Sequence, residues 1–182
     1  MKKQGLSPAA KAKLVEQKRK AMLHIDGDSP LAMLSTAAKT TVTGNMKGLT
    51  VIIDFPDERG TITQTQVEHF LNDLNYTEFG NAQSIRGYFR SVSGGKLDYT
   101  NTVSPYYTAK HNKSYYADSS LESSVRSQEL IHEALDWMEN QQDFDFSTLT
   151  TDSHGLIKGL NFFYAGASNS LLAHGLWPIW AV

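Results

Sequence analysis

The 182-residue chain contains no cysteine and no long apolar run. The lack of cysteine excludes disulfides, cysteine-ligated zinc sites and thiol nucleophiles. No apolar stretch approaches the roughly 20 residues that a transmembrane helix needs, so we expect no membrane span. The basic start, MKKQGLSPAAKAKL, is followed by no apolar core, and we predict no signal peptide in this chain. The net charge of −2 gives the chain no overall attraction to nucleic acid. We therefore do not expect nucleic acid as a partner.

Three segments of different composition divide the chain. Residues 1–25 predict a basic leader helix, because Met1–Leu23 holds seven Lys or Arg residues and one Glu. Two interpretations remain open: a solvated helix on or beside the domain, or an arm for an acidic partner or membrane surface. Residues 26–47 are rich in small and turn-forming residues and are interpreted as a linker. Residues 48–182, with 40% hydrophobic content in the whole chain, are expected to form the folded domain.

The spacing of apolar residues predicts alternating strands and helices in this domain. Thr63 and Gln66 have capping-box spacing, and Ser84 is a good N-cap before a helix that Gly94 and Gly95 should end. We expect strands near 48–55, 96–103, 156–166 (the central one) and 176–182, and helices near 63–74, 84–93 and 119–140. The order of these elements indicates a layered α/β domain.

The stretch from Ser84 to Val103 is the clearest unit. Ile85, Tyr88 and Phe89 are spaced to form one apolar helical face. In the strand that follows, Leu97, Tyr99, Asn101 and Val103 should point to one side of the sheet. The next segment, SPYYTAKHNKSYYADSS, is interpreted as a loop. Its tyrosines either form a wall of a peptide or sugar groove or lie on the sheet edge.

Three groups of polar residues are candidate sites. The segment His132–Asp136 resembles the zinc motif HExxH, with an aspartate in place of the second histidine. Two interpretations remain open: His132 and Asp136 are two ligands of a metal site that lacks a third ligand, or they are an ordinary His–Asp pair at the edge of the apolar helix face. Asp54 and Asp57 follow the first strand and suit a cation site, a charge beneath a cleft, or hydrogen bonds at the strand exit. Asp152 lies in a glycine-containing loop with spaced acids, which suits either calcium or a capped turn.

The order of several segments resembles the catalytic domain of the immune inhibitor A family of secreted zinc metallopeptidases. These segments are VIIDFPD (51–57), SIRGYFRSVSGGKLDYTNTV (84–103), KSYY (113–116), the EAL of the long helix, the DFDFSTL loop leading to NFFYAG, and GLWP (175–178). The resemblance implies a zincin-like twisted mixed sheet with packed helices, protein or peptide substrates, and an extracellular location. It also implies hydrolysis by zinc-activated water.

In that family the HExxH helix follows the GLWP segment, and this sequence contains no HExxH. We therefore expect an incomplete, N-terminal part of the domain that binds no zinc and is inactive by itself. The resemblance places Trp177, Pro178 and Trp180 at the substrate cleft. Calcium stays possible at Asp54, Asp57 and Asp152, although Thr150 and His154 stand where the family's cation loop usually has acids. The alternative is a non-catalytic peptide- or glycan-binding module on the same scaffold.

Overall fold

The computed structural model describes residues 42–117 and 123–166. Its elements are β1 (Gly44–Asp54), α3 (Gln64–Asn72), η1 (Glu78–Gly80), α4 (Ile85–Val92), β2 (Leu97–Thr108), α5 (Lys113–Tyr116), α6 (Ser123–Asn140), η2 (Phe146–Thr148) and β3 (Leu160–Tyr164). The predicted leader helix, most of the linker and the strand near 176–182 lie outside the described residues. The loop Asp152–Leu156 belongs to a different compact unit from Thr43–Thr151 and is treated by itself.

The described strands form a parallel sheet in the order β2-β1-β3. β1 is the central strand, and its residues from Gly48 to Asp54 are buried, which confirms the strand expected to be covered on both faces. The α/β class is confirmed. The pairings of β1 with β2 and with β3 are both parallel, where the sequence predicted a mixed sheet, and only the isolated bridges Phe55–Glu58 and Thr151–Ile157 among the described residues are antiparallel. β3 is shorter than predicted and lies beside β1 rather than at the centre of this sheet.

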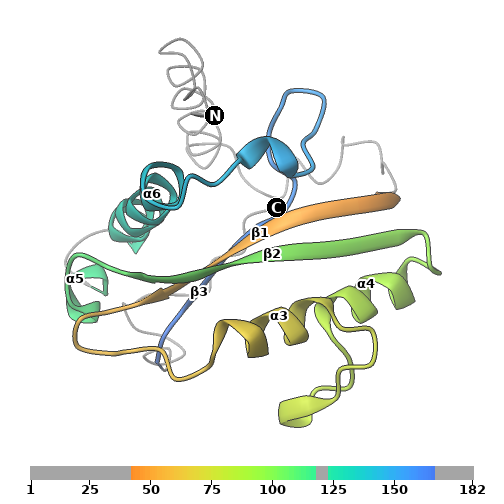
Figure 1. Ribbon diagram of the computed structural model, residues 1–182, viewed down its shortest axis with the longest axis horizontal. Helices are drawn as coiled ribbons and strands as arrows, with labels where there is room; N and C mark the ends of the chain where they lie inside the picture. The colour runs from red at the N-terminus through yellow and green to blue at the C-terminus, as the bar shows by residue number, and fades with distance from the viewer. Residues whose placement is uncertain (1–41, 118–122, 167–182) are drawn as a thin grey trace, which may run out of the picture. The chain divides into compact units, whose positions relative to one another are not determined.

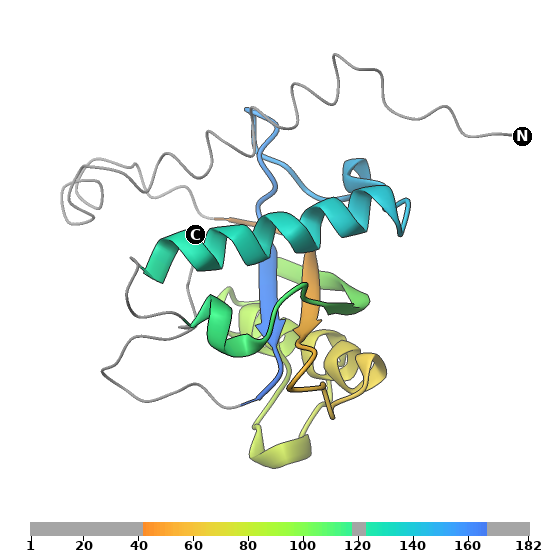
Figure 2. The same cartoon turned by 90° about the vertical axis from the view of Figure 1, so that its left-hand side faces the viewer.

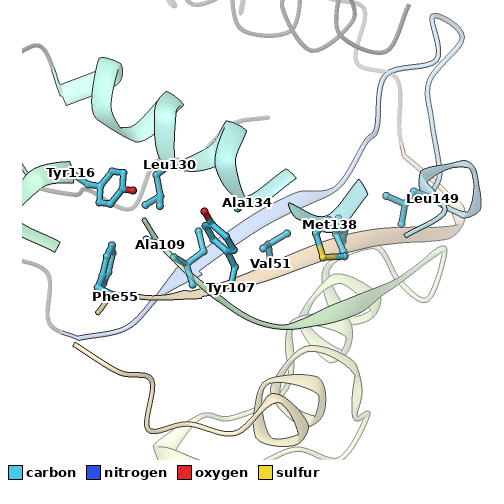
Figure 3. Close-up of a cluster of buried hydrophobic side chains, with 11 residues drawn as sticks. Val51, Phe55, Tyr107, Ala109, Tyr116, Leu130, Ala134, Met138 and Leu149 are labelled. Carbon is cyan, nitrogen blue, oxygen red and sulfur yellow. The ribbon is translucent and has the colours of Figure 1, made fainter. Parts of the chain in front are cut away.

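The helices cover opposite faces of the sheet (Figures 1 and 2). Val51 of β1, and Phe55 directly after this strand, pack with Leu130, Ala134 and Met138 of α6 in one buried cluster (Figure 3). On the other face, Ile52 packs with Val67 and Leu71 of α3 and with Val103 of β2. Burial of each such large side chain contributes roughly 1.5–3 kcal/mol, so these two layers supply the main stabilisation of the fold.

The local capping signals of the sequence are confirmed. The Thr63 hydroxyl accepts a hydrogen bond from Gln66 N, and the Gln66 side chain accepts one from Thr63 N. The Ser84 hydroxyl accepts a bond from Gly87 N at the start of α4. After α4, Gly94 and Gly95 have φ values of 61° and 78°, which explains why this helix ends at two glycines.

Residues 104–108, predicted as loop, continue β2 instead. The register shifts between Thr50 and Ile52, where Ser104 and Pro105 form a bulge. Ile52 N donates to the Ser104 hydroxyl over 3.1 Å, which replaces a strand hydrogen bond at the irregularity, and Pro105, which has no N–H, is exposed. KSYY, also placed in the loop, is the short helix α5.

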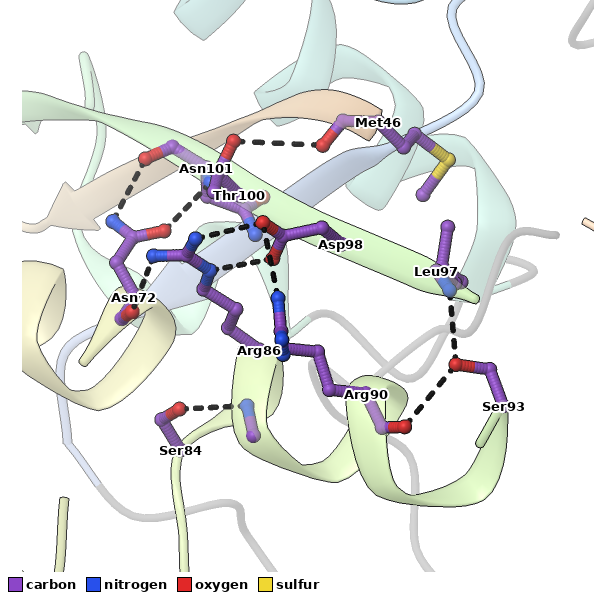
Figure 4. A network of polar contacts seen from close by, with 11 residues as sticks. Met46, Asn72, Ser84, Arg86, Arg90, Ser93, Leu97, Asp98, Thr100 and Asn101 are labelled. Atoms are coloured by element: carbon purple, nitrogen blue, oxygen red, sulfur yellow. Dashed lines mark hydrogen bonds and ion pairs between the residues drawn. The ribbon is translucent and has the colours of Figure 1, made fainter. Parts of the chain in front are cut away.

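The predicted apolar face of α4 is only partly buried. Ile85 and Phe89 pack inward, but Tyr88 is 50% exposed. The opposite charges of Arg86 and Asp98 hold this helix on the sheet: Arg86 Nε and Nη2 donate to the two Asp98 oxygens over 2.6 and 2.7 Å (Figure 4). Arg90 adds a contact of 3.5 Å to the same carboxylate. The hydrogen bond from Arg86 therefore lowers the pKa of Asp98.

A belt of polar side chains joins the three strands to α3. Asn161 of β3 donates from Nδ2 to Asn101 Oδ1 over 3.0 Å and to Tyr99 OH over 3.1 Å. Thr50 of β1 donates to the same Asn101 oxygen over 3.3 Å. From α3, the Asn72 amide bonds both the N–H and the C=O of Asn101, at 2.8 and 2.9 Å (Figure 4). The belt ties the register of all three strands to one helix.

We predict that Asp98→Asn lowers the free energy of unfolding by about 1–2 kcal/mol at pH 7, because it removes a charge-assisted pair. The lowered pKa of Asp98 fixes the sign of the pH dependence. The stabilisation is complete above the unfolded pKa of about 4 and is lost as pH falls through the folded pKa. Urea melts from pH 7 to pH 3 should show the two proteins converging in acid. Glu78→Gln, which removes a carboxylate at an exposed position, is the control. If the free energies of unfolding of Asp98→Asn and the unmodified protein differ by the same amount from pH 7 down to pH 3, the prediction is contradicted.

Candidate functional site

Asp54 is a buried carboxylate at the carboxyl end of β1, on the α3 face. Its side chain is 4% exposed, and its Oδ2 lies 3.1 Å from Arg59 Nε. Gly60 N also donates to Oδ2, over 3.4 Å. Within the described residues, Oδ1 is buried and accepts no hydrogen bond. The positive group beside Asp54 is therefore the Arg59 side chain, at the place where the sequence suggested a bound cation.

Asp57 and Glu58, in the turn after β1, hold the neighbouring helix. Asp57 Oδ1 accepts a bond of 2.9 Å from Lys113 N, the first residue of α5. Glu58 Oε2 lies 2.8 Å from Lys113 Nζ, whose side chain is 12% exposed. Asp57 thus caps a helix, which is one of the hydrogen-bonding roles open to a residue at a strand exit.

Asp152 organises its own loop. Its Oδ1 accepts hydrogen bonds from His154 N and Leu156 N, at 2.8 and 2.9 Å. These bonds, that from Leu156 foremost, lower the pKa of the Asp152 carboxyl. The geometry matches the capped turn, and it offers no support for the calcium loop that was the other interpretation.

His132 and Asp136 are both exposed on α6. In the part of the chain that the structure describes, no group of three or more His, Asp or Glu side chains is placed to hold a metal ion. The residue between them in sequence, Glu133, points the other way and is buried. The similarity to HExxH therefore does not extend to a set of metal ligands among these residues.

Glu133 is the centre of a buried polar cluster that the sequence did not reveal. Its Oε2 accepts bonds from Tyr116 OH over 2.9 Å and Tyr107 OH over 3.1 Å. Lys110 N lies 3.5 Å from the same oxygen, and Lys110 Nζ lies 4.0 Å from Oε1. Burial, and then the charge and hydrogen bonds of Glu133, raise the pKa of both tyrosines. The cluster joins β2, α5 and α6.

Tyr115 makes a second connection between α5 and α6, at the surface. Its ring lies 4.1 Å from the His111 ring, and the Arg126 guanidinium carbon lies 3.9 Å from its centroid. Its hydroxyl contacts Glu129, which also pairs with Arg126 over 2.7 Å. Tyr107, Tyr115 and Tyr116 therefore hold helices in place. This role differs from both sequence-based interpretations, a groove wall and a position on the sheet edge. Trp177, Pro178 and Trp180, assigned to the substrate cleft, lie outside the described residues.

Comparison with known protein families identifies the family to which this chain is similar. The model of the immune inhibitor A peptidase M6 catalytic domain matches residues 35–155, more than half of the chain. The chain belongs to this family. The resemblance read from the sequence is thus confirmed, and this is a metallopeptidase-family domain. None of the curated proteins compared with the chain matches it.

Zinc, the metal of M6 peptidases, does not fit the residues described here. The sequence contains no HExxH, and the described His, Asp and Glu side chains form no group that could hold a metal ion. A zinc site needs at least three protein ligands around one position. No catalytic step through zinc is therefore assigned to the described residues.

The Glu133 cluster gives a stability prediction. Glu133→Leu should lower the free energy of unfolding by about 3 kcal/mol, because two buried phenols lose their acceptor. Tyr116→Phe should cost only about 1 kcal/mol, since it removes one donor from a carboxylate that keeps another. Denaturant melts of both variants and of the double variant measure the coupling. Additive effects in the double variant would show that Glu133 and Tyr116 do not interact.

Proposed function

We propose that this chain is the N-terminal part of the catalytic domain of an extracellular zinc endopeptidase, and that the zinc-binding helix is contributed by other sequence. The observation that carries the proposal is the M6 family match over residues 35–155 in a sequence without HExxH. M6 peptidases act on proteins and are typically extracellular. No described helix has both the length and the apolar character needed to cross a membrane.

The fold supports this proposal. The described residues form a parallel sheet with α6 on one face and α3 and α4 on the other, a scaffold on which a further helix could pack. The structure uses its buried acids for other purposes: Glu133 binds two tyrosines and Asp54 binds an arginine. In this proposal the chain supplies the sheet and the supporting helix. The water-activating metal and its ligands come from elsewhere.

We predict that the purified 182-residue chain does not hydrolyse casein, with or without added zinc. The reason is that three zinc ligands and a general base are required together. Release of acid-soluble peptides measures the activity, and a characterised zinc endopeptidase is the positive control. Chelator-sensitive hydrolysis that persists in a His132→Ala/Asp136→Ala variant would overturn the proposal, because the chain would then hold a complete site. Loss of hydrolysis in that variant would instead assign the metal to this pair.

The coding sequence downstream of Val182 is the direct test of the first half of the proposal. An HExxH motif on an amphipathic helix in the same reading frame would support it. Co-expression of that segment with this chain should then restore zinc-dependent hydrolysis. A coding sequence that supplies no such motif would favour a non-catalytic module on the M6 scaffold.

A further inference from the structure

The carboxyl ends of β1 and β2 lie next to each other, and the chain leaves them toward opposite faces of the sheet. After β1 it continues to α3 on one face, and after β2 it continues to α5 and α6 on the other (Figure 1). Asp54 and Thr108 are paired in the register at this point. In open α/β sheets, ligands bind in the region outside the carboxyl ends of the strands.

Arg59 is held at this position by two side chains. Its Nε lies 3.1 Å from Asp54 Oδ2, and its Nη1 donates to Thr108 Oγ1 over 2.8 Å. The Arg59 side chain is nevertheless 61% exposed. Two contacts on one side therefore orient the planar guanidinium, while the greater part of the side chain remains in contact with solvent.

This arrangement is costly for a purely structural contact. The Asp54 carboxyl group is buried, and its Oδ1 accepts no hydrogen bond within the described residues. Pairing a buried carboxylate with an exposed arginine recovers little of the cost of burying its charge.

We propose that Arg59, oriented by Asp54 and Thr108, binds an oxyanion, a carboxylate or phosphate group, at the carboxyl ends of β1 and β2. Guanidinium groups form paired hydrogen bonds with both anions, and a guanidinium fixed in advance loses less freedom on binding. Arg59 contacts the ligand, whereas Asp54 and Thr108 are positioning residues. The neighbouring acid Glu58 is paired with Lys113, so its charge opposes the anion less. The site uses no metal and does not depend on the peptidase proposal.

The test is a titration of the ¹⁵N-labelled full chain, at constant ionic strength, with inorganic phosphate and separately with N-acetylglutamate. We expect saturable shifts of the Arg59 Nε–H and Gly60 N–H signals. Arg59→Lys keeps the charge but loses the fork, and should weaken binding about tenfold. The matched control is Arg90→Lys, a half-exposed arginine paired with Asp98, which should leave binding unchanged. Tighter binding of N-acetylglutamate would identify a carboxylate ligand, and tighter binding of phosphate a phosphoryl ligand.

The positioning roles are tested by Asp54→Asn and Thr108→Val. Thr108→Val should weaken anion binding while Arg59 is still present. Asp54→Asn removes the orienting carboxylate and also a negative charge that opposes the anion, so a changed affinity in either direction shows that Asp54 acts on the site. Thr108 is exposed, so Thr108→Val should fold normally even if Asp54→Asn does not. Absence of saturable shifts with both anions, or equal affinity in the Arg59→Lys variant, would overturn the site. Unchanged affinity in folded Asp54→Asn and in Thr108→Val would overturn the positioning roles.

Discussion

The rest of the structure depends on the pairing of β1 with a strand on each side. This strand is buried on both faces, so its amides and carbonyls cannot be left for water and must bond to strands on both sides. Apolar side chains alone specify the register of such a strand poorly, because neighbouring registers bury similar groups. The polar belt of Thr50, Asn101 and Asn161 favours the observed alignment, because both Thr50 and Asn161 donate to Asn101 Oδ1 in this register, although Asn101 Nδ2 has no partner among the described residues. Asn72 also bonds to the backbone of Asn101, so the position of α3 on its face of the sheet is fixed relative to the same residue.

Most of the elements within residues 44–140 could be predicted because their signals are local. The Thr63 capping box, the Ser84 cap and the glycines after α4 each act within a few residues of the helix end that they define. The continuation of β2 beyond Pro105 could not be predicted in this way. It depends on Ser104 meeting Ile52 N, a contact between residues 52 positions apart in the sequence. A proline read alone predicts the end of a strand, and only the partner strand shows that a bulge accommodates it.

The candidate site was less predictable than the fold. The sequence drew attention to His132 and Asp136 because they stand one helical turn apart, but the same periodicity puts both on the exposed face of α6. Glu133, between them in sequence, is turned inward for that reason. A buried glutamate has no distinctive sequence signal, because its partners Tyr107 and Tyr116 come from two other elements. Arg59 was not singled out either, since an arginine in a turn is ordinarily solvated.

Glu133 and Asp54 are buried acids on opposite faces of the sheet, and their hydrogen-bond partners give them different roles. The Glu133 carboxylate accepts bonds from two phenols, so its charge is spread over neutral donors that are themselves buried. Asp54 instead has one charged partner, and that partner extends into solvent. The Glu133 carboxylate stabilises the contact between α6 and the sheet, whereas Asp54 orients an arginine whose side chain is largely exposed to solvent and can donate to an acceptor there. Because a shared scaffold does not dictate a shared site, membership of the M6 family does not explain the residues at the end of β1, which must be explained by their own chemistry.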